Sequence, residues 1–230
     1  MIPKKIHYIW LGNNPIPEKH LKYMESWKKY CPDYEIIRHD ETNLNIDINM
    51  YCRQAYDSQK WAFASDVLRY LVLFEEGGIY LDTDVELIKP LDDFLQEKLF
   101  FGFETKECVA PGLILGAEKG NKYIGDLLKE YSNRNFINQD NSYNLKTICD
   151  YCSEYLYAKG LIPNGQTQHY AEFSAYAIEV FNPANYSGRI VRKTKKTYSI
   201  HHYASSWKPK KTFFQKVINK IKKMFKKTKK

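Results

Sequence analysis

The sequence predicts an α/β domain with a central mixed sheet. Short apolar runs typical of buried strands alternate with longer segments whose apolar residues recur at helical spacing, which is the pattern of α/β domains. With 230 residues, of which 43% are hydrophobic and 15% aromatic, the chain can bury one sizeable core but not two comfortable ones. Its apolar runs are far shorter than the roughly 18 residues that a membrane span needs. One globular domain is therefore expected.

Each expected element follows from its local pattern. The apolar part of the N-terminal stretch is too short for a signal peptide. Residues 6–12 are instead predicted to form a strand that ends at Gly12. Residues 17–30 begin with Pro and Glu and indicate a helix. Residues 60–76 are apolar around most of their circumference and precede two glycines, which predicts a buried helix ending there. The other expected elements are strands at 34–40, 79–81, 100–104, 112–118 and 197–207, helices near 124–131 and 145–159, and a strand followed by a turn over 178–188.

The five cysteines are scattered and odd in number, which does not indicate a disulfide framework. Cys149 and Cys152 form a single CxxC inside an expected helix, and no second pair completes a set of four zinc ligands. We expect reduced structural thiols and a reducing compartment.

The net charge of +8 is unevenly distributed. Residues 208–230 hold 11 of the 35 basic residues and none of the 27 acidic ones, so residues 1–207 carry a net charge of −3. A nucleic-acid-binding domain needs a basic face for phosphate contacts, so we expect no nucleic-acid partner. The sequence predicts a folded domain over 1–207 and a basic tail over 208–230.

The tail has the pattern of a helix that lies on a membrane surface, since its apolar residues recur at helical spacing among lysines. An anionic membrane is its expected partner. The alternatives are a helix packed on the domain, a solvated tail, or a non-enzymatic membrane-surface adaptor that acts through this segment. The apolar residues are Phe213, Phe214, Val217, Ile218, Ile221, Met224 and Phe225.

Two carboxylates end the apolar stretch GGIYLDTDVEL, residues 77–87. Side chains at positions i and i+2 of a strand point the same way, so Asp82 and Asp84 converge if the strand continues to its end. Carboxylates this close repel one another unless a cation lies between them, and such oxygen ligands suit Mg²⁺ or Mn²⁺. The alternative is an ordinary polar turn, because Asp favours turns.

Asp66 and Arg69 interrupt the apolar middle of the helix at 60–76, and their spacing of three places them on one face. An Arg beside an acid can grasp sugar hydroxyls and a phosphate, because the guanidinium is a forked donor. The alternative is an ordinary ion pair within the helix.

Three separated segments carry a resemblance to a known family. ASDVLRYLVLFEEGGIYLDTDVELIKPL (64–91) resembles the DxD core of retaining glycosyltransferases related to initiating α-mannosyltransferases and to bacterial capsular and lipopolysaccharide sugar transferases, of the kind called family 32. IPKKIHYIWLG (2–12) resembles the first strand of that family, and HHYASSW (201–207) resembles its C-terminal motif. The resemblance implies a GT-A fold, a Rossmann-like nucleotide-sugar-binding domain.

The resemblance also assigns roles to the N-terminal half of the site. Trp10 would stack on the base, with Gly12 beside the nucleotide. Asp66 and Arg69 would hold the donor sugar and phosphates. Asp82 would contact the ribose and the metal, and Asp84 would bind the metal directly.

For the C-terminal motif, the resemblance implies that His202, or its neighbour His201, adds a metal ligand. Ser205, Ser206 and Trp207 would contact the diphosphate. An indole N–H is a donor only, so it can steady the growing charge of a leaving diphosphate.

The function that follows is metal-dependent retaining transfer of a hexose or N-acetylhexosamine from a nucleotide-sugar, preferably a UDP-sugar, to a saccharide or lipid-linked acceptor of a bacterial surface polysaccharide. The cofactor would be Mn²⁺ or Mg²⁺, and the enzyme would be cytoplasmic and peripheral on the inner face of the plasma membrane. The alternative enzyme is a haloacid-dehalogenase-type phosphatase, because IYLDTDV (79–85) matches its DxDx[TV] signature. That motif normally follows the first strand of its domain, whereas here it lies some eighty residues into the chain.

Overall fold

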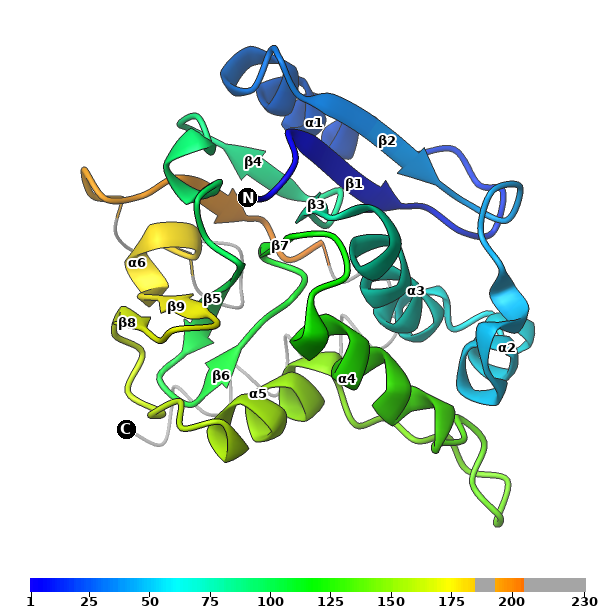
Figure 1. Ribbon diagram of the computed structural model, residues 1–230. Coiled ribbons are helices and arrows are strands. Elements are labelled where there is room, and N and C mark those ends of the chain that lie inside the picture. The colour runs from blue at the N-terminus through cyan, green and yellow to red at the C-terminus, as the bar shows by residue number, and fades with distance from the viewer. Residues whose placement is uncertain (185–192, 205–230) are drawn as a thin grey trace, which may run out of the picture.

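The computed structural model describes residues 1–184 and 193–204, and its centre is a mixed eight-stranded sheet (Figure 1). The predicted α/β class is confirmed. The strands in spatial order are β2 (Glu35–His39), β1 (Lys5–Ile9), β3 (Gly78–Tyr80), β7 (Leu115–Ala117), β5 (Leu99–Thr105), β9 (Ser174–Tyr176) and β8 (Gln168–His169), with β6 (Cys108–Val109) also paired to β5.

The strand directions create a binding edge. β1 is parallel to both β2 and β3, whereas β7 is antiparallel to β3 and β5. The chain leaves β1 for β2 on one side and later returns to β3 on the other. In open α/β sheets, ligands bind beyond the carboxyl ends of the strands at such a reversal. The residues that follow β1 and β3 therefore lie where a ligand is expected.

A separate two-stranded sheet stands next to this edge. It pairs β4 (Val85–Leu87) with β10 (Ser199–His201) in antiparallel register. Because β4 begins directly after Asp84, this pairing brings a C-terminal segment to the end of β3.

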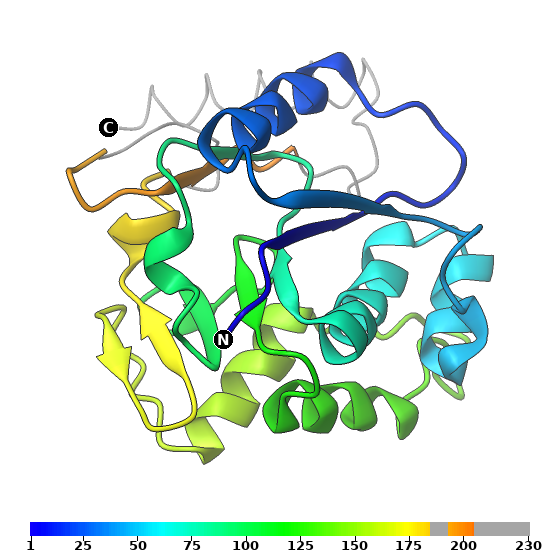
Figure 2. The ribbon, with the colours of Figure 1, turned by 45° about the horizontal axis from the view of Figure 1, so that its top comes forward.

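Helices cover both faces of the central sheet (Figures 1 and 2). One face packs against α1 together with two short helices, and the other packs against the other described helices. The first group is α1 (Glu18–Tyr30), the 3₁₀ helix η2 (Asp92–Phe94) and α6 (Ile178–Phe181). The second is α2 (Met50–Asp57), which follows the 3₁₀ helix η1 (Ile46–Ile48), then α3 (Trp61–Glu76), α4 (Lys122–Ser132) and α5 (Ile148–Ala158).

The core consists of two apolar clusters separated by the sheet. Successive residues of one strand belong to different clusters: Ile79 packs with α1 and Tyr80 with α3, and Phe100 and Phe101 divide in the same way. All four side chains are at most 2% exposed. Successive side chains of a strand point to opposite faces, so apolar runs without alternation mark strands that are buried on both sides.

The end of α3 shows why the glycine pair follows it. Gly77 has φ +68° and ψ −179°, a conformation essentially restricted to glycine. A Cβ at Gly77 would lie 2.6 Å from the backbone nitrogen of Lys119. The chain can therefore turn directly from the helix into β3.

Several expected elements differ from the observed ones. The first strand ends at Ile9 rather than Gly12. The strand expected from residue 178 is wrong, because Ile178–Phe181 form α6 with Val180 and Phe181 buried. Four residues of apolar alternation fit one helical turn as well as a strand. The turn expected after them extends into residues outside the described part.

The C-terminal predictions reach the described residues only in part. The last strand ends at His201, and the amphipathic helix expected over 208–230 lies outside the described residues. Among the helices that the structure describes, none has the length and apolar character to cross a membrane. All five cysteines are free; Cys31, Cys52 and Cys152 are buried, and the other two are partly exposed.

Candidate functional site

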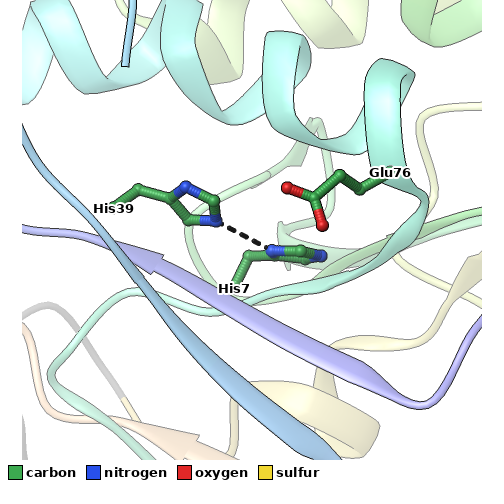
Figure 3. Close-up of side chains that lie close together, drawn as sticks. All are labelled: His7, His39 and Glu76. Atoms are coloured by element: carbon green, nitrogen blue, oxygen red, sulfur yellow. Dashed lines mark hydrogen bonds between the residues drawn. The ribbon is translucent and has the colours of Figure 1, made fainter. Parts of the chain in front are cut away.

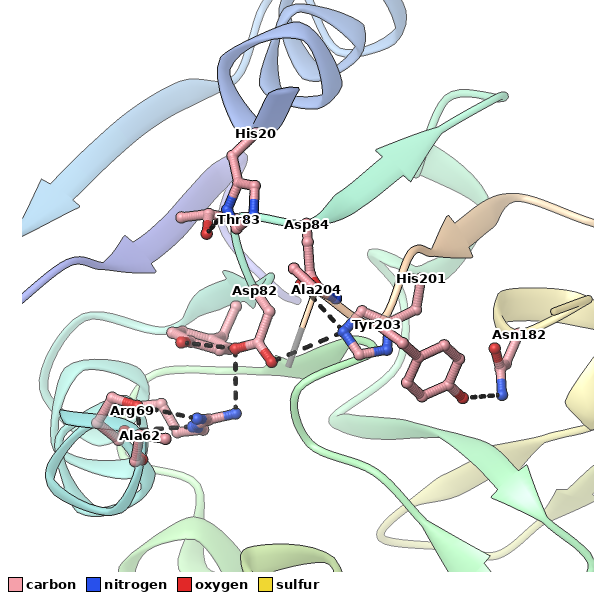
Figure 4. A network of polar contacts seen from close by, with 12 residues as sticks. His20, Ala62, Arg69, Asp82, Thr83, Asp84, Asn182, His201, Tyr203 and Ala204 are labelled. Atoms are coloured by element: carbon pink, nitrogen blue, oxygen red, sulfur yellow. Dashed lines mark hydrogen bonds and ion pairs between the residues drawn. The ribbon is translucent and has the colours of Figure 1, made fainter. Parts of the chain in front are cut away.

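Asp82 and Asp84 lie in a turn between β3 and β4, not in a continued strand (Figure 4). The amide of Val85 donates to the carbonyl of Asp82 over 3.0 Å, which closes the turn. The expectation that a continued strand aligns the two carboxylates is therefore wrong. The carboxylates nevertheless converge, since one oxygen from each lies within 4.8 Å of the other and of a His201 nitrogen.

His201 is the histidine that joins the two aspartates. It is the last residue of β10, opposite Val85, and its Nε2 lies 3.0 Å from Asp84 Oδ1 and 4.0 Å from Asp82 Oδ2. His202 was preferred as the metal ligand from the sequence, but its Nε2 lies 2.9 Å from Glu86 and its ring stacks on Tyr23. Neighbouring side chains of an extended chain point to opposite sides, so only one of the two histidines can face the turn.

The electrostatics of Asp84 and His201 are coupled. Burial raises the pKa of Asp84, but the neighbouring His201 and the amide of Ala204 outweigh it and bring the pKa to about 2. The Ala204 amide donates to Asp84 Oδ2 over 2.7 Å. Burial lowers the pKa of His201, yet the Asp84 carboxylate more than compensates and the pKa is raised. Asp84 is therefore a fixed negative charge next to His201.

Helix α3 brings Asp66 and Arg69 to the same place. Their side chains form an ion pair of 2.8 Å, and Arg69 Nη1 lies 3.4 Å from Asp82 Oδ1. Burial raises the pKa of Asp66 to about 7 against the opposing effect of Arg69. The prediction that Asp66 and Arg69 lie on one face of the helix is confirmed. Arg69 also contacts Asp82 in the turn.

Three contacts that the sequence reasoning missed hold the turn in position. The Tyr80 hydroxyl donates to Asp82 Oδ1 over 3.0 Å, and its ring lies 4.5 Å below the Arg69 guanidinium. His20 Nδ1, from the first turn of α1, lies 2.9 Å from the Thr83 hydroxyl. Of these residues, only Tyr80 could have been found from the sequence, because it lies two residues before Asp82 at the end of a predicted strand.

Gly112 lets the backbone approach Asp82. Its carbonyl accepts the Asp82 amide over 3.1 Å. A Cβ on Gly112 would lie 2.3 Å from Asp82 Oδ2 and 3.2 Å from Arg69 Nη1. The absence of a side chain at Gly112 is thus what allows Asp82 and Arg69 to share this space.

Trp10 and Gly12 follow β1 at the same edge of the sheet. The Trp10 indole is partly exposed, donates to the carbonyl of Asn14 over 2.7 Å and meets His20 edge to face at 5.9 Å. Gly12 has φ +89° and packs against the indole of Trp61. Through His20, Trp10 is linked to the Asp82–Asp84 turn. Ser205, Ser206 and Trp207 lie outside the described residues, so their roles stay predictions.

The residues at the turn fit a divalent cation. Two carboxylates and an imidazole offer one ligand atom each within a 4.8 Å cluster, and the buried Nδ1 of His201 has no hydrogen-bond partner among the described residues. Carboxylates suit Mg²⁺ and Mn²⁺, and an imidazole adds preference for a transition metal. The donor set therefore fits a divalent cation of this kind.

The fold and the site together define a class of protein. A mixed sheet with a strand-order reversal and an acidic DXD turn after β3, beside a buried Asp–Arg pair, is the arrangement expected of the GT-A fold. Residues 17–101 match the family described as glycosyltransferase sugar-binding region containing DXD motif. Over these residues the chain is similar to the DXD-containing glycosyltransferases.

Curated relatives agree with this family. The chain is 29% identical to the initiation-specific alpha-1,6-mannosyltransferase of Candida albicans over 50% of its length and 32% of that protein. It is 31% identical to inositol phosphoceramide mannosyltransferase 3 of Schizosaccharomyces pombe over 54% of its length and 35% of that protein. The chain thus spans about a third of the length of these two relatives.

Solved structures share the fold at low sequence identity. PaToxG glycosyltransferase superposes with a TM-score of 0.53 and 22% identity, over 69% of each chain. A glycosyltransferase involved in glycosylation of the major capsid of PBCV-1 superposes with a TM-score of 0.50 and 11% identity, over 88% of this chain and 94% of that one. The GT-A fold expected from the sequence is confirmed.

Proposed function

We propose that the protein is a metal-dependent glycosyltransferase that moves a sugar from a nucleotide-sugar to a saccharide acceptor. The observation that carries this proposal is the convergence of Asp82, Asp84 and His201, whose ligand atoms cluster within 4.8 Å, with Arg69 3.4 Å from Asp82. One cation and one fixed guanidinium at the end of β3 suit a diphosphate that links a nucleotide to a sugar.

Within this proposal, each residue of the site has a definite task. Asp82, Asp84 and His201 hold the ion, which, when bound, stabilises negative charge on the leaving diphosphate. Arg69 donates to the donor sugar or its phosphate, and Asp66 accepts from a sugar hydroxyl. Because the ion pair with Asp66 and the Tyr80 ring fix Arg69, its donors are positioned before the donor sugar arrives.

The finer assignments belong to the same proposal. We favour retention of configuration, a UDP-hexose or UDP-N-acetylhexosamine donor, and a lipid-linked or surface polysaccharide acceptor at the inner face of a bacterial plasma membrane. Retention rests on the family resemblance, and the membrane location rests on the basic tail. The relatives above are named mannosyltransferases, so GDP-mannose is the donor against which the UDP-sugars are to be compared.

The test is nucleotide release from a panel of UDP-sugars and GDP-mannose with Mn²⁺. We expect one donor to be turned over, with activity lost in EDTA and restored by Mn²⁺. Asp84→Asn removes a metal ligand and should lower kcat/KM at least about 100-fold, as the loss of transition-state charge stabilisation does elsewhere. Full activity of this variant, or activity in EDTA, would contradict the metal role.

Two controls separate loss of chemistry from loss of fold. Glu86→Gln changes the carboxylate that contacts His202 outside the cluster, and we expect it to keep activity. Hydrolysis of p-nitrophenyl phosphate with Mg²⁺, without release of nucleotide from any donor, would instead favour the phosphatase alternative.

A further inference from the structure

A second group of potential metal ligands lies between the strands β1 and β2 and the end of α3 (Figure 3). In the parallel register, Ile9 is opposite His39 and Ile37 is opposite His7. Residues two apart in a strand share a face, so His7 and His39 lie on the same face of the sheet. Glu76, the last residue of α3, lies over that face, and one ligand atom from each residue lies within 4.8 Å of the others.

The hydrogen bonds of His7 determine where its proton lies. His7 Nε2 is 2.8 Å from the carbonyl oxygen of Gly77, and a carbonyl only accepts, so Nε2 carries the proton and Nδ1 has a lone pair. That lone pair faces Nε2 of His39 at 2.9 Å, which must donate to it. Histidines that bind metals commonly donate their second N–H to a backbone carbonyl, so His7 is already in the tautomer and orientation of a ligand.

Burial and charge also favour a cation here. His7 is 0% and His39 4% exposed, and burial lowers the pKa of His7 to about 4, so the imidazole is neutral as metal binding requires. Burial raises the pKa of Glu76, but Lys5 together with His7 and His39 outweighs this, and the pKa is lowered. Lys5 contacts Oε2 of Glu76 at 2.7 Å, and a carboxylate can bind a metal through its other oxygen.

The distances require little movement. A tetrahedral ion with bonds of roughly 2.0–2.1 Å holds two nitrogen ligands about 3.3 Å apart. The two histidine nitrogens are 2.9 Å apart, so they would separate by about 0.4 Å. Gly78 leaves room on the far side of the ring, because a Cβ there would lie 2.8 Å from His7 Nε2. The Glu76 side chain is partly exposed, so one of the three residues is in contact with solvent.

We propose that His7, His39 and Glu76 bind one Zn²⁺ or similar borderline divalent ion, through Nδ1, Nε2 and one carboxylate oxygen respectively, with water as the fourth ligand. Two imidazoles and a carboxylate are a known ligand set for four-coordinate zinc with an open position. The proton on Nε2 of His39 is taken up at its Nδ1, so the histidine–histidine hydrogen bond is exchanged for two metal bonds. The ion ties β1, β2 and the end of α3 together, apart from the Asp82–Asp84 turn.

The experiment uses the full chain carrying Asp82→Asn and Asp84→Asn, so that the turn after β3 does not bind the probe. The protein is stripped with EDTA and titrated with Co²⁺. We expect one equivalent to bind with the visible absorption of a four-coordinate ion and without thiolate charge-transfer bands, and Zn²⁺ to displace it. The absence of thiolate bands separates this site from the cluster of Glu104, Cys108 and Cys149.

Two ligand variants and one matched control decide the outcome. His39→Gln and, separately, Glu76→Gln should each weaken binding by at least about 100-fold, since even the loss of a group that supports a ligand costs 10–100-fold. Glu76→Gln keeps the shape of a partly exposed residue, so it serves if His39→Gln fails to fold. Lys5→Met removes the ion pair but no ligand and should bind Co²⁺ at least as tightly. No binding, binding unchanged in both ligand variants, or thiolate bands would overturn the proposal.

Discussion

At the scale of single residues, Gly112 controls the space beside Asp82. Gly112→Ala would place a Cβ 2.3 Å from Asp82 Oδ2, and the carboxylate must move away from the metal position. A displacement of about 1 Å in a catalytic constellation can cost about 100-fold in rate. We therefore expect a comparable loss of kcat/KM for nucleotide release and weaker Mn²⁺ binding, with little change in the melting temperature.

Gly125→Ala is the matched control for this substitution. It also adds one methyl group, but Gly125 lies on α4 and faces the exposed ring of Phe74 on α3, where the Cβ would lie 2.8 Å from a ring carbon that can swing outward. Activity should be retained in Gly125→Ala. Normal kinetics in Gly112→Ala would mean that Asp82 does not act from the position described.

Cys108 is the cysteine whose reactivity should differ from an ordinary thiol. A hydrogen bond with Cys149, together with a second one from Ser153, lowers the pKa of Cys108 although burial opposes this. The thiolate is the reactive form, so alkylation of Cys108 should reach half its maximal rate at a lower pH than alkylation of an ordinary thiol, whose pKa is about 8.5. Iodoacetamide labelling at roughly pH 6–10, followed by peptide mass spectrometry, measures the pH of half-maximal labelling for each cysteine.

The comparison residues lie in the same chain. Burial raises the pKa of Cys31 to about 11 and that of Cys52 to about 12, so both should label slowly throughout. Cys149→Ala removes the largest cause and should move the Cys108 midpoint upward. If Cys108 reaches half-maximal labelling at no lower pH than Cys31, the hydrogen bond between the Cys108 and Cys149 thiols does not lower the Cys108 pKa.

At the scale of elements, the junction between α3 and β3 determines whether both sites form. Gly77→Ala forces a conformation nearly restricted to glycine and places a Cβ 2.6 Å from the Lys119 backbone nitrogen. We expect the free energy of unfolding to fall by about 3 kcal/mol. Gly120→Ala is the control, since it also has positive φ (+70°) but nothing within 4 Å, and about 1 kcal/mol is expected. Urea denaturation measures both free energies of unfolding. Equal losses in the two variants would show that the contact with the Lys119 backbone does not destabilise Gly77→Ala.

Most of the long elements could be predicted from the sequence, whereas several of the short ones could not. Helix α3 was expected at 60–76 and spans Trp61–Glu76, because sixteen residues repeat the helical period several times. β4 and β9 have three residues each, too few to show any period. α6 was mistaken for a strand for the same reason.

The site was predictable where its residues are close in sequence. Asp66 and Arg69 share a helix face by spacing alone, and their ion pair is observed. The choice between His201 and His202 could not be predicted, because it depends on which residue of β10 lies opposite Val85. Contacts from His20 and Gly112 to the acidic turn depend on packing between distant segments, which local pattern does not encode.

At the scale of the whole molecule, the reversal of strand order at β1 brings the two sites within one sheet. The turn after β3 contacts α1, α3 and β10. The residues just before β3 contact His7 of β1, which in turn contacts His39 of β2. Metal at the second site would therefore stabilise the elements that support the first. A rise in melting temperature with Zn²⁺ in the Asp82→Asn and Asp84→Asn background would measure this stabilisation separately from catalysis.

The last prediction concerns the distribution of charge over the full chain. Residues 1–207 carry a net charge of −3 and residues 208–230 carry 11 lysines without an acid, so an anionic membrane should repel the first part and attract the second. Each lysine near such a surface contributes about 1 kcal/mol, and the attraction is screened by salt. In flotation assays, the full chain should bind anionic vesicles at low salt, whereas a chain ending at Trp207 should not.

A second comparison separates charge from insertion. Replacing Phe213, Phe214 and Phe225 by Ser keeps every lysine but removes apolar area worth about 25 cal/mol per Å² when buried. If the tail inserts its apolar residues, this variant should bind at low salt and dissociate at a lower salt concentration than the full chain. Equal flotation of the full and shortened chains would remove the tail from the account, and with it the argument for placing the transferase on a membrane.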